Sequence, residues 1–134
     1  MRFRLTEPTT LVEDREITVL QAEDATGRFG IRAGHEHFVT ALEPSILVWR
    51  FPGEDGTGER ERFAAVRGGV LHATGDRVVA AVRSAHVSEA LDELEAIVRR
   101  ARETRTERKR QSARSFYQMQ IAAWRRIMEY EDDA

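Results

Sequence analysis

Residues 78–94 read VVAAVRSAHVSEALDEL, and the chain changes its secondary structure within this stretch. The run Val78-Val79-Ala80-Ala81-Val82 is rich in β-branched residues, which favours a strand. From Ser88 onward the apolar residues recur at every third or fourth position, as on one face of a helix. Ser88 is suited to cap that helix, and Glu89 and Asp92 fall where the helix dipole favours anions. The stretch therefore predicts a β-rich part followed by a helical part.

The part before residue 87 has the pattern of several short strands. Residues 2–6 and 16–20 alternate polar and apolar side chains, and residues 41–49 are rich in β-branched residues. Turn-forming residues separate these runs, and Gly75-Asp76 is typical of a tight hairpin. Many short strands with frequent turns indicate an antiparallel sandwich or barrel. We expect an N-terminal antiparallel β-sandwich domain at residues 1–86.

Residues 87–134 contain neither glycine nor proline and carry two apolar stripes at helical spacing. Leu91, Leu94, Val98 and Ala101 form the first stripe, and the second runs from Ala113 to Ile127. The polar segment 104–112 lies between them. We expect a second domain at residues 87–134, a two-helix hairpin with its turn near residues 104–111. A single long helix is the competing interpretation, and either form needs a surface that buries the stripes.

Composition excludes several classes of protein. The chain has 134 residues, 41% of them hydrophobic and 33% charged, with a formal net charge of −2, so the chain as a whole makes no case for nucleic acid. It has no cysteine, which excludes a disulfide framework, thiol catalysis and cysteine-ligated zinc. No segment approaches the roughly 20 apolar residues that cross a bilayer, so we expect no direct insertion into a membrane.

The segment 27–38, GRFGIRAGHEHF, holds two of the four histidines. His35 and His37 have a metal-ligand spacing, but no other cluster offers the further ligands that zinc needs, so we expect no metal. Gly27, Gly30 and Gly34 do not precede a helix that could hold phosphates, and we expect them to supply turns and bulges. No serine lies in a nucleophile elbow. We therefore expect no catalytic residues and no cofactor.

Residues 99–114 are strongly basic. Such a segment can neutralise phosphates, form a solvated helix face or meet an acidic protein surface, and the residues alone leave these three open. The basic residues are Arg99, Arg100, Arg102, Arg105, Arg108, Lys109, Arg110 and Arg114.

The whole pattern resembles the epsilon subunit of F-type ATP synthases. That family reads roughly Gly-x-x-Gly-Ile-Leu-Pro-x-His, followed by Leu and Pro-Gly. The residues on those places are Gly30, Ile31, His35, Leu42 and Pro44, and Gly68-Gly69 matches a later Gly-Gly pair. The resemblance covers the whole chain, and the two-part fold that it implies is the one that the patterns above predict.

Three departures from the family pattern matter. Arg32-Ala33 replaces Leu-Pro and Ser45 replaces the glycine, and the His-x-His-Phe form is more similar to the alternate, sodium-or-proton-coupled branch. Some family members bind ATP through Leu/Ile-Asp-x-x-Arg-Ala on the helical hairpin. Here Glu95 stands in place of that arginine, and its negative charge would repel phosphate, so we predict no nucleotide binding.

The resemblance implies a rotor subunit that is not itself an enzyme. It would lie in the central stalk and couple ion-driven rotation of the membrane ring to ATP synthesis, with the coupling ion, proton or sodium, left open. Its localisation would be peripheral, at the cytoplasmic face of the bacterial inner membrane. The residues expected to contact the gamma subunit or the ring of c subunits are Arg28, Phe29, Gly30, Ile31, Gly34, His35, His37 and Leu42.

The resemblance also gives the helical domain a role. The hairpin could extend along the stalk and inhibit ATP hydrolysis, with the basic residues of segment 99–114 meeting an acidic loop of the beta subunits. Two other classes compete with the stalk subunit. One is a nucleic-acid-binding module that uses segment 99–114, and the other is a small β-sandwich ligand-binding protein.

Overall fold

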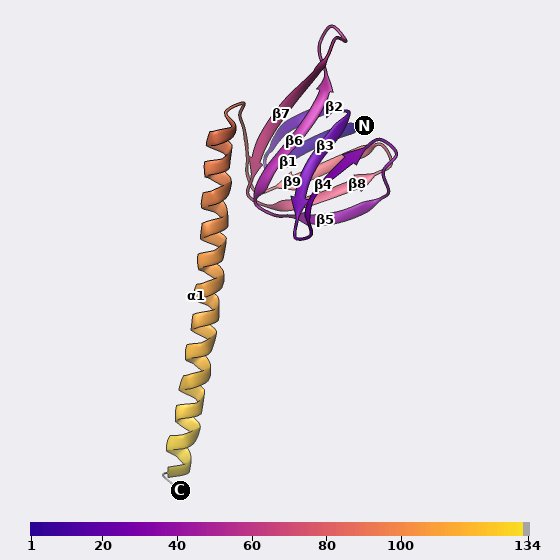
Figure 1. The fold of residues 1–134 in the computed structure, drawn as a ribbon. Helices are drawn as coiled ribbons and strands as arrows, with labels where there is room; N and C mark the ends of the chain where they lie inside the picture. Colours follow the sequence, from indigo (N-terminus) through magenta and orange to yellow (C-terminus); the bar gives the residue numbers. More distant parts are fainter. Residues whose placement is uncertain (133–134) are drawn as a thin grey trace. The chain divides into compact units, whose positions relative to one another are not determined.

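The computed structural model describes residues 1–132, apart from the side chains of residues 117 and 128–132. The described residues form ten strands in two layers, followed by one helix (Figure 1). The β-sandwich and the helical segment that follows it confirm the fold class expected from the sequence.

The first layer has the strand order β10-β7-β6-β3-β4. Its strands are β10 (Ala85–Val87), β7 (Glu59–Val66), β6 (Ser45–Pro52), β3 (Val19–Asp24) and β4 (Gly27–Arg32). All its neighbouring strands are antiparallel.

The second layer has the order β5-β8-β9-β1-β2. Its strands are β5 (Phe38–Leu42), β8 (Gly69–Thr74), β9 (Arg77–Val82), β1 (Arg2–Glu7) and β2 (Thr10–Glu16). Its pairs are antiparallel except β1 with β9, which is parallel. Between β3 and β5 the strand pairing that links the two layers is limited to Asp24 with Leu42, and the Glu43 N–H also donates to the Glu23 carbonyl at 3.1 Å.

The core lies between the two layers. Phe3 of β1 and Trp49 of β6 are both completely buried, and their ring centroids are 5.2 Å apart at an interplanar angle of 52°. Because β1 and β6 belong to different layers, this aromatic pair joins the layers through side chains. The other fully enclosed side chains around it include Leu5, Leu20, Leu47, Leu71 and Val78.

A buried carboxylate closes one side of the sandwich. Glu13 of β2 is 8% exposed. It accepts a hydrogen bond from Arg15 Nε at 3.0 Å, and another from Arg62 Nη1 of β7 at 3.2 Å. Both guanidinium groups lie over the ring of Phe51, at 4.2 and 5.7 Å from its centroid. The charge of Glu13 is therefore matched by two cations, which is what burial of a carboxylate requires.

The helix α1 (Leu91–Asp132) is continuous over 42 residues. The turn that the sequence predicted near residues 104–111 is wrong, because these residues are helical, and the competing single-helix interpretation holds in this structure. The physical reason lies in their composition, since arginine, glutamate, lysine and glutamine are good helix formers and no glycine or proline interrupts them. Thr106 Oγ1 also donates to the carbonyl of Arg102, one turn back.

The start of α1 packs on the outer face of the first layer. Leu94 is completely buried and Val98 is 7% exposed, and they lie against Ala65 and Phe63 of β7 and Ile46 of β6. The chain accordingly divides into two compact units, Met1–Ala101 and Arg102–Ala134, so the first unit includes these three turns of helix. The domain boundary expected at residues 86/87 stays a prediction.

We predict that Leu94→Ala lowers the free energy of unfolding by about 2–5 kcal/mol, because it removes a completely buried side chain. Urea denaturation of the full chain measures this change. Leu91→Ala is the matched control, since Leu91 is 42% exposed, and should change stability by no more than about 0.5 kcal/mol. Equal losses in the two variants would contradict the docking of α1 through Leu94.

Candidate contact surfaces

The strand β4 forms one edge of the first layer and pairs only with β3. Its side chains alternate, with Ile31 in the core at 2% exposure and Arg28, Gly30 and Arg32 on the solvent side. The expectation that Ile31 faces a partner is therefore wrong. Leu42, at 5% exposure on β5, is a core residue for the same reason.

The loop between β4 and β5 carries His35 and His37, which are separated by one residue. His35 is half-buried, its Nδ1 lies 3.0 Å from the carbonyl oxygen of Glu36, and its buried Nε2 has no hydrogen-bond partner among the described residues. His37 is exposed. The rings of Phe29 and Phe38 meet edge to face beside this loop, and their centroids are 6.0 Å apart. In the part of the chain that the structure describes, no three His, Asp or Glu side chains gather as metal ligands.

The glycines of this region do not share one role. Gly27 and Gly34 have φ angles of 120° and 83°, which side chains rarely adopt, so both serve the turns that the sequence predicted. Gly30 lies inside β4, where it pairs with Gln21, and its φ angle is not in that region. The prediction of a turn or bulge is therefore wrong for Gly30.

Asp24 fixes the position of β4 relative to the second layer. Its Oδ1 accepts hydrogen bonds from the Thr26 backbone N–H at 2.9 Å and from the Thr26 hydroxyl at 2.5 Å, which holds the β3–β4 turn. Its Oδ2 accepts a hydrogen bond from the Thr40 hydroxyl of β5 at 2.7 Å. The hydroxyls of Thr26 and Thr40, followed by the Thr26 N–H, lower the pKa of Asp24 because they stabilise its charged form.

The outer face of the second layer carries exposed apolar side chains on β5 and β8, beside the exposed polar residues Arg4, His72 and Arg77, and the sequence analysis did not identify this apolar patch. Val39 of β5 is 64% exposed and Val70 of β8 is 49% exposed. Ala41 pairs with Val70, and Val70 pairs with Ala81 of β9, so these side chains form one row across three strands. The signal in the sequence was the continuous apolar run at residues 78–82. Such a run is typical of a strand that is covered on both faces.

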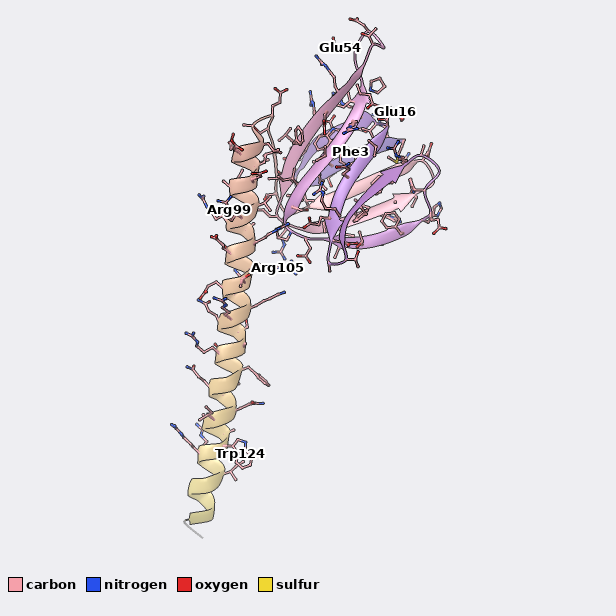
Figure 2. The ribbon with its side chains drawn as sticks, viewed as in Figure 1. Phe3, Glu16, Glu54, Arg99, Arg105 and Trp124 are labelled. Atoms are coloured by element: carbon pink, nitrogen blue, oxygen red, sulfur yellow. The ribbon has the colours of Figure 1, made fainter. Side chains whose placement is uncertain are left out.

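The basic segment 99–114 lies wholly on α1 and is exposed apart from Ala101. Figure 2 labels Arg99 and Arg105 on this helix. Within the second unit, one helical face carries Arg105, Arg108 and Ser112, because the intervals between them are close to whole turns. The apolar stripe therefore gives way to a polar and basic stretch after Ala101.

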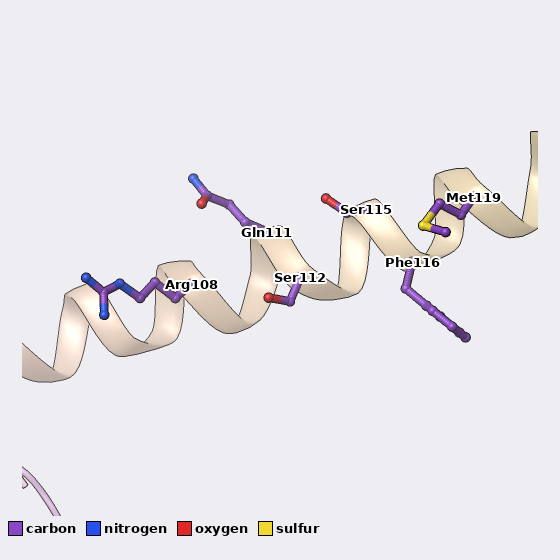
Figure 3. Close-up of a pocket in the computed structure, with 6 residues that line it drawn as sticks. All are labelled: Arg108, Gln111, Ser112, Ser115, Phe116 and Met119. Atoms are coloured by element: carbon purple, nitrogen blue, oxygen red, sulfur yellow. The ribbon is translucent and has the colours of Figure 1, made fainter.

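A second apolar stretch follows further along α1. The exposed fractions are 62% for Phe116, 71% for Met119, 67% for Trp124 and 54% for Ile127. The shallow depression beside it is lined by residues of this helix alone (Figure 3), so it is a helix face and not an enclosed ligand site. The lining residues are Arg108, Gln111, Ser112, Ser115, Phe116 and Met119.

The stretch that corresponds to the nucleotide motif has a structural role at the start of α1. Leu94 is buried, and Glu93 Oε1 lies 3.2 Å from His86 Nε2 of β10. Glu95, in the place of the motif's arginine, is exposed. The absence of nucleotide binding stays a prediction. Within residues 1–132, no helix is long and apolar enough to cross a membrane.

Comparison with known proteins decides the family. A family model described as "ATP synthase, Delta/Epsilon chain, beta-sandwich domain" matches residues 1–88. The chain belongs to the ATP synthase epsilon-chain family. ATP synthase epsilon chain 2 of Paraburkholderia xenovorans is 35% identical over 132 residues, which cover 97% of this chain and 91% of that relative. ATP synthase epsilon chain 2 of Cereibacter sphaeroides is 35% identical over 136 residues, which cover 100% of this chain and 90% of that relative.

Two solved structures share the fold of this epsilon chain. A chain of the Euglena gracilis mitochondrial ATP synthase, solved as OSCP/F1/c-ring, superposes with a TM-score of 0.59 at 24% identity, covering 78% of this chain and 62% of that one. A chain of the Tetrahymena thermophila mitochondrial ATP synthase central stalk and c-ring superposes with a TM-score of 0.51 at 15% identity. The superposition covers 63% of this chain and 64% of that one. This epsilon chain thus spans less than two thirds of each of those chains. As a member of its family, it is a non-catalytic part of the ATP synthase complex.

We predict a pH-dependent loss of stability in Asp24→Asn. The pKa of Asp24 is lowered by folding, so its charge stabilises the fold above the unfolded pKa of about 4, and this contribution is lost as the pH falls through the folded pKa. The urea midpoint of the wild type should exceed that of Asp24→Asn at pH 7, and the gap should close below about pH 4. A gap that stays constant down to pH 2 would contradict the role of the charge.

Proposed function

We propose that this epsilon chain is a central-stalk rotor subunit of an F-type ATP synthase, bound to the gamma subunit and to the membrane ring of c subunits. The observation that carries the proposal is the exposed apolar patch at Val39 and Val70 on the outer face of the second layer. Apolar residues on both sides of a sheet are expected where a second protein covers the side that the chain's own core does not. In a family of non-catalytic subunits of one complex, the covering protein is a neighbouring subunit.

Two surfaces divide the stalk contacts in this proposal. The apolar patch around Val39 and Val70 contacts gamma, because exposed apolar side chains suit a lasting interface. The edge strand β4 and the loop that follows it contact the ring through their exposed residues, which are Arg28, Gly30, Arg32, Gly34 and His37. In this arrangement the chain is peripheral to the membrane and lies on the cytoplasmic side of the bacterial inner membrane.

The helix α1 supplies the regulatory part of the proposal. Its basic residues meet an acidic surface of the beta subunits, and its second apolar stretch, from Phe116 to Ile127, is covered in the assembled complex. The high exposure of four large apolar side chains there supports an interaction surface, since isolated apolar patches of this kind are rare on free proteins. We propose that this contact inhibits ATP hydrolysis.

We expect Val70→Asp to weaken binding to epsilon-depleted ATP synthase from the same source by at least tenfold, because a carboxylate would be buried in an apolar interface. Binding is measured by titrating the labelled full-length chain onto the purified depleted complex. Ala90→Asp adds the same charge at an exposed position outside the proposed surfaces and should bind like the wild type. Equal binding by the two variants would contradict the proposed contact between the apolar patch around Val70 and a neighbouring subunit.

The regulatory role is tested by replacing Arg105, Arg108 and Arg110 with glutamate. The wild-type chain should lower ATP hydrolysis by the depleted complex and saturate near one chain per complex, whereas the triple glutamate variant should bind without inhibiting. The charge-conserving triple lysine variant should inhibit, and added salt should weaken the inhibition. Full inhibition by the glutamate variant would show that these charges play no part.

A further inference from the structure

The second apolar stretch of α1 has the repeat of an interface between two helices. Its central stripe has alternating intervals of three and four residues and consists of Ala113, Phe116, Gln120, Ala123 and Ile127. These are the intervals of the a and d positions of a coiled coil, which face a second helix. Met119 and Trp124, which are 71% and 67% exposed, lie on either side of the stripe.

This stripe has no cover within its own unit. Among the described residues, the unit that begins at Arg102 consists of α1 alone. A helix in water is stabilised mainly by the packing of its apolar face, and large apolar side chains gathered on a surface mark a contact. The free chain is therefore expected to cover this stripe with a second surface.

The stripe is nearly symmetrical about Gln120. Ala113 and Ile127 lie seven residues to either side of it, and Phe116 and Trp124 lie four residues to either side. Such a surface matches its own copy turned end for end, which is how the subunits of a two-fold dimer meet. Gln120 would then lie at the axis, where its amide can both donate a hydrogen bond to the second copy and accept one.

The charges along this part of the chain select the same orientation. Residues 107–111 carry three cations and one carboxylate, whereas residues 129–133 carry four carboxylates. In an antiparallel pair centred on Gln120, the basic segment of each copy is opposite the acidic segment of the other. A parallel pair would set like charges against each other, which is unfavourable.

We propose that the free chain forms an antiparallel dimer through the central stripe of the second apolar stretch, with its two-fold axis at Gln120. The partner is a second copy of this chain, which goes beyond the proposed function. The exposed apolar side chains of both copies would together bury on the order of 1,000 Å², the lower limit for a specific interface, so the dimer dissociates on dilution. Because the dimer covers the stretch that meets the complex, inhibition requires the monomer.

Sedimentation equilibrium of the purified full-length chain tests the dimer. The apparent mass should rise from one chain to two with increasing concentration. Phe116→Asp should raise the dissociation constant at least tenfold, because it places a carboxylate in the apolar interface. Gln118→Asp is the matched control, since it adds the same charge at an exposed position on the opposite side of α1, and it should dimerise like the wild type.

Two outcomes of this measurement overturn the proposal. One is a wild-type chain that stays monomeric at every concentration. The other is a Phe116→Asp chain that dimerises like the wild type, and loss of that dimer in Val70→Asp would place the contact on the second layer instead. Neither outcome affects the proposed function, which fails if the chain does not bind the epsilon-depleted complex.

The orientation is tested with single cysteines, because the chain has none of its own. Gln120→Cys should form a disulfide-linked dimer under mild oxidation, since the two copies of position 120 meet at the axis. Ala113→Cys should not, because the two copies of position 113 are about 21 Å apart along an antiparallel pair. Cross-linking of Ala113→Cys, or none of Gln120→Cys, would overturn the antiparallel arrangement.

Discussion

The packing of Phe3 against Trp49 joins the two layers of the sandwich. It thereby determines which face of each layer points outward and is left for other contacts. The pair fixes which side of each strand points inward, because side chains alternate along a strand. Each layer then has an outer face that can pack against another element or another protein. In the first layer that face receives Leu94 and Val98 of α1. In the second layer Val39 and Val70 stay exposed, so the chain alone leaves apolar area that an assembly can bury.

Few residue pairs connect the strands of the two layers. The hydrogen bonds of Asp24 are therefore important for holding the layers together at this point. A single residue pair links β3 to β5, and β4 pairs with β3 alone. An edge strand held on one side needs its turn to be fixed, and the hydrogen bonds from Thr26 and Thr40 to Asp24 do this. The exposed arginines and the glycine of β4 are thus presented on a strand whose position is set by one well-satisfied carboxylate.

The sequence predicted the parts of this structure that depend on local period. Alternation and turn residues indicated the strands, and the change at Ser88 indicated the helix. What it could not predict depends on contacts between distant residues, such as the Glu13–Arg62 pair between β2 and β7. The role of Ile31 was wrong because a motif position does not reveal the side to which a strand residue points. The turn near residues 104–111 was wrong because a polar segment without glycine or proline is also a good helix.

The arrangement of α1 follows from where its apolar residues fall. Leu94 and Val98 are buried apolar residues in the first unit, whereas Phe116 and Ile127 are exposed in the second unit, after the polar stretch at Arg105 to Ser112. Each apolar stretch needs a surface that removes it from water. The first is buried by β6 and β7, within the unit that ends at Ala101. The second is exposed at Phe116, Met119, Trp124 and Ile127, and the basic stretch that precedes it favours a receptor with acidic groups.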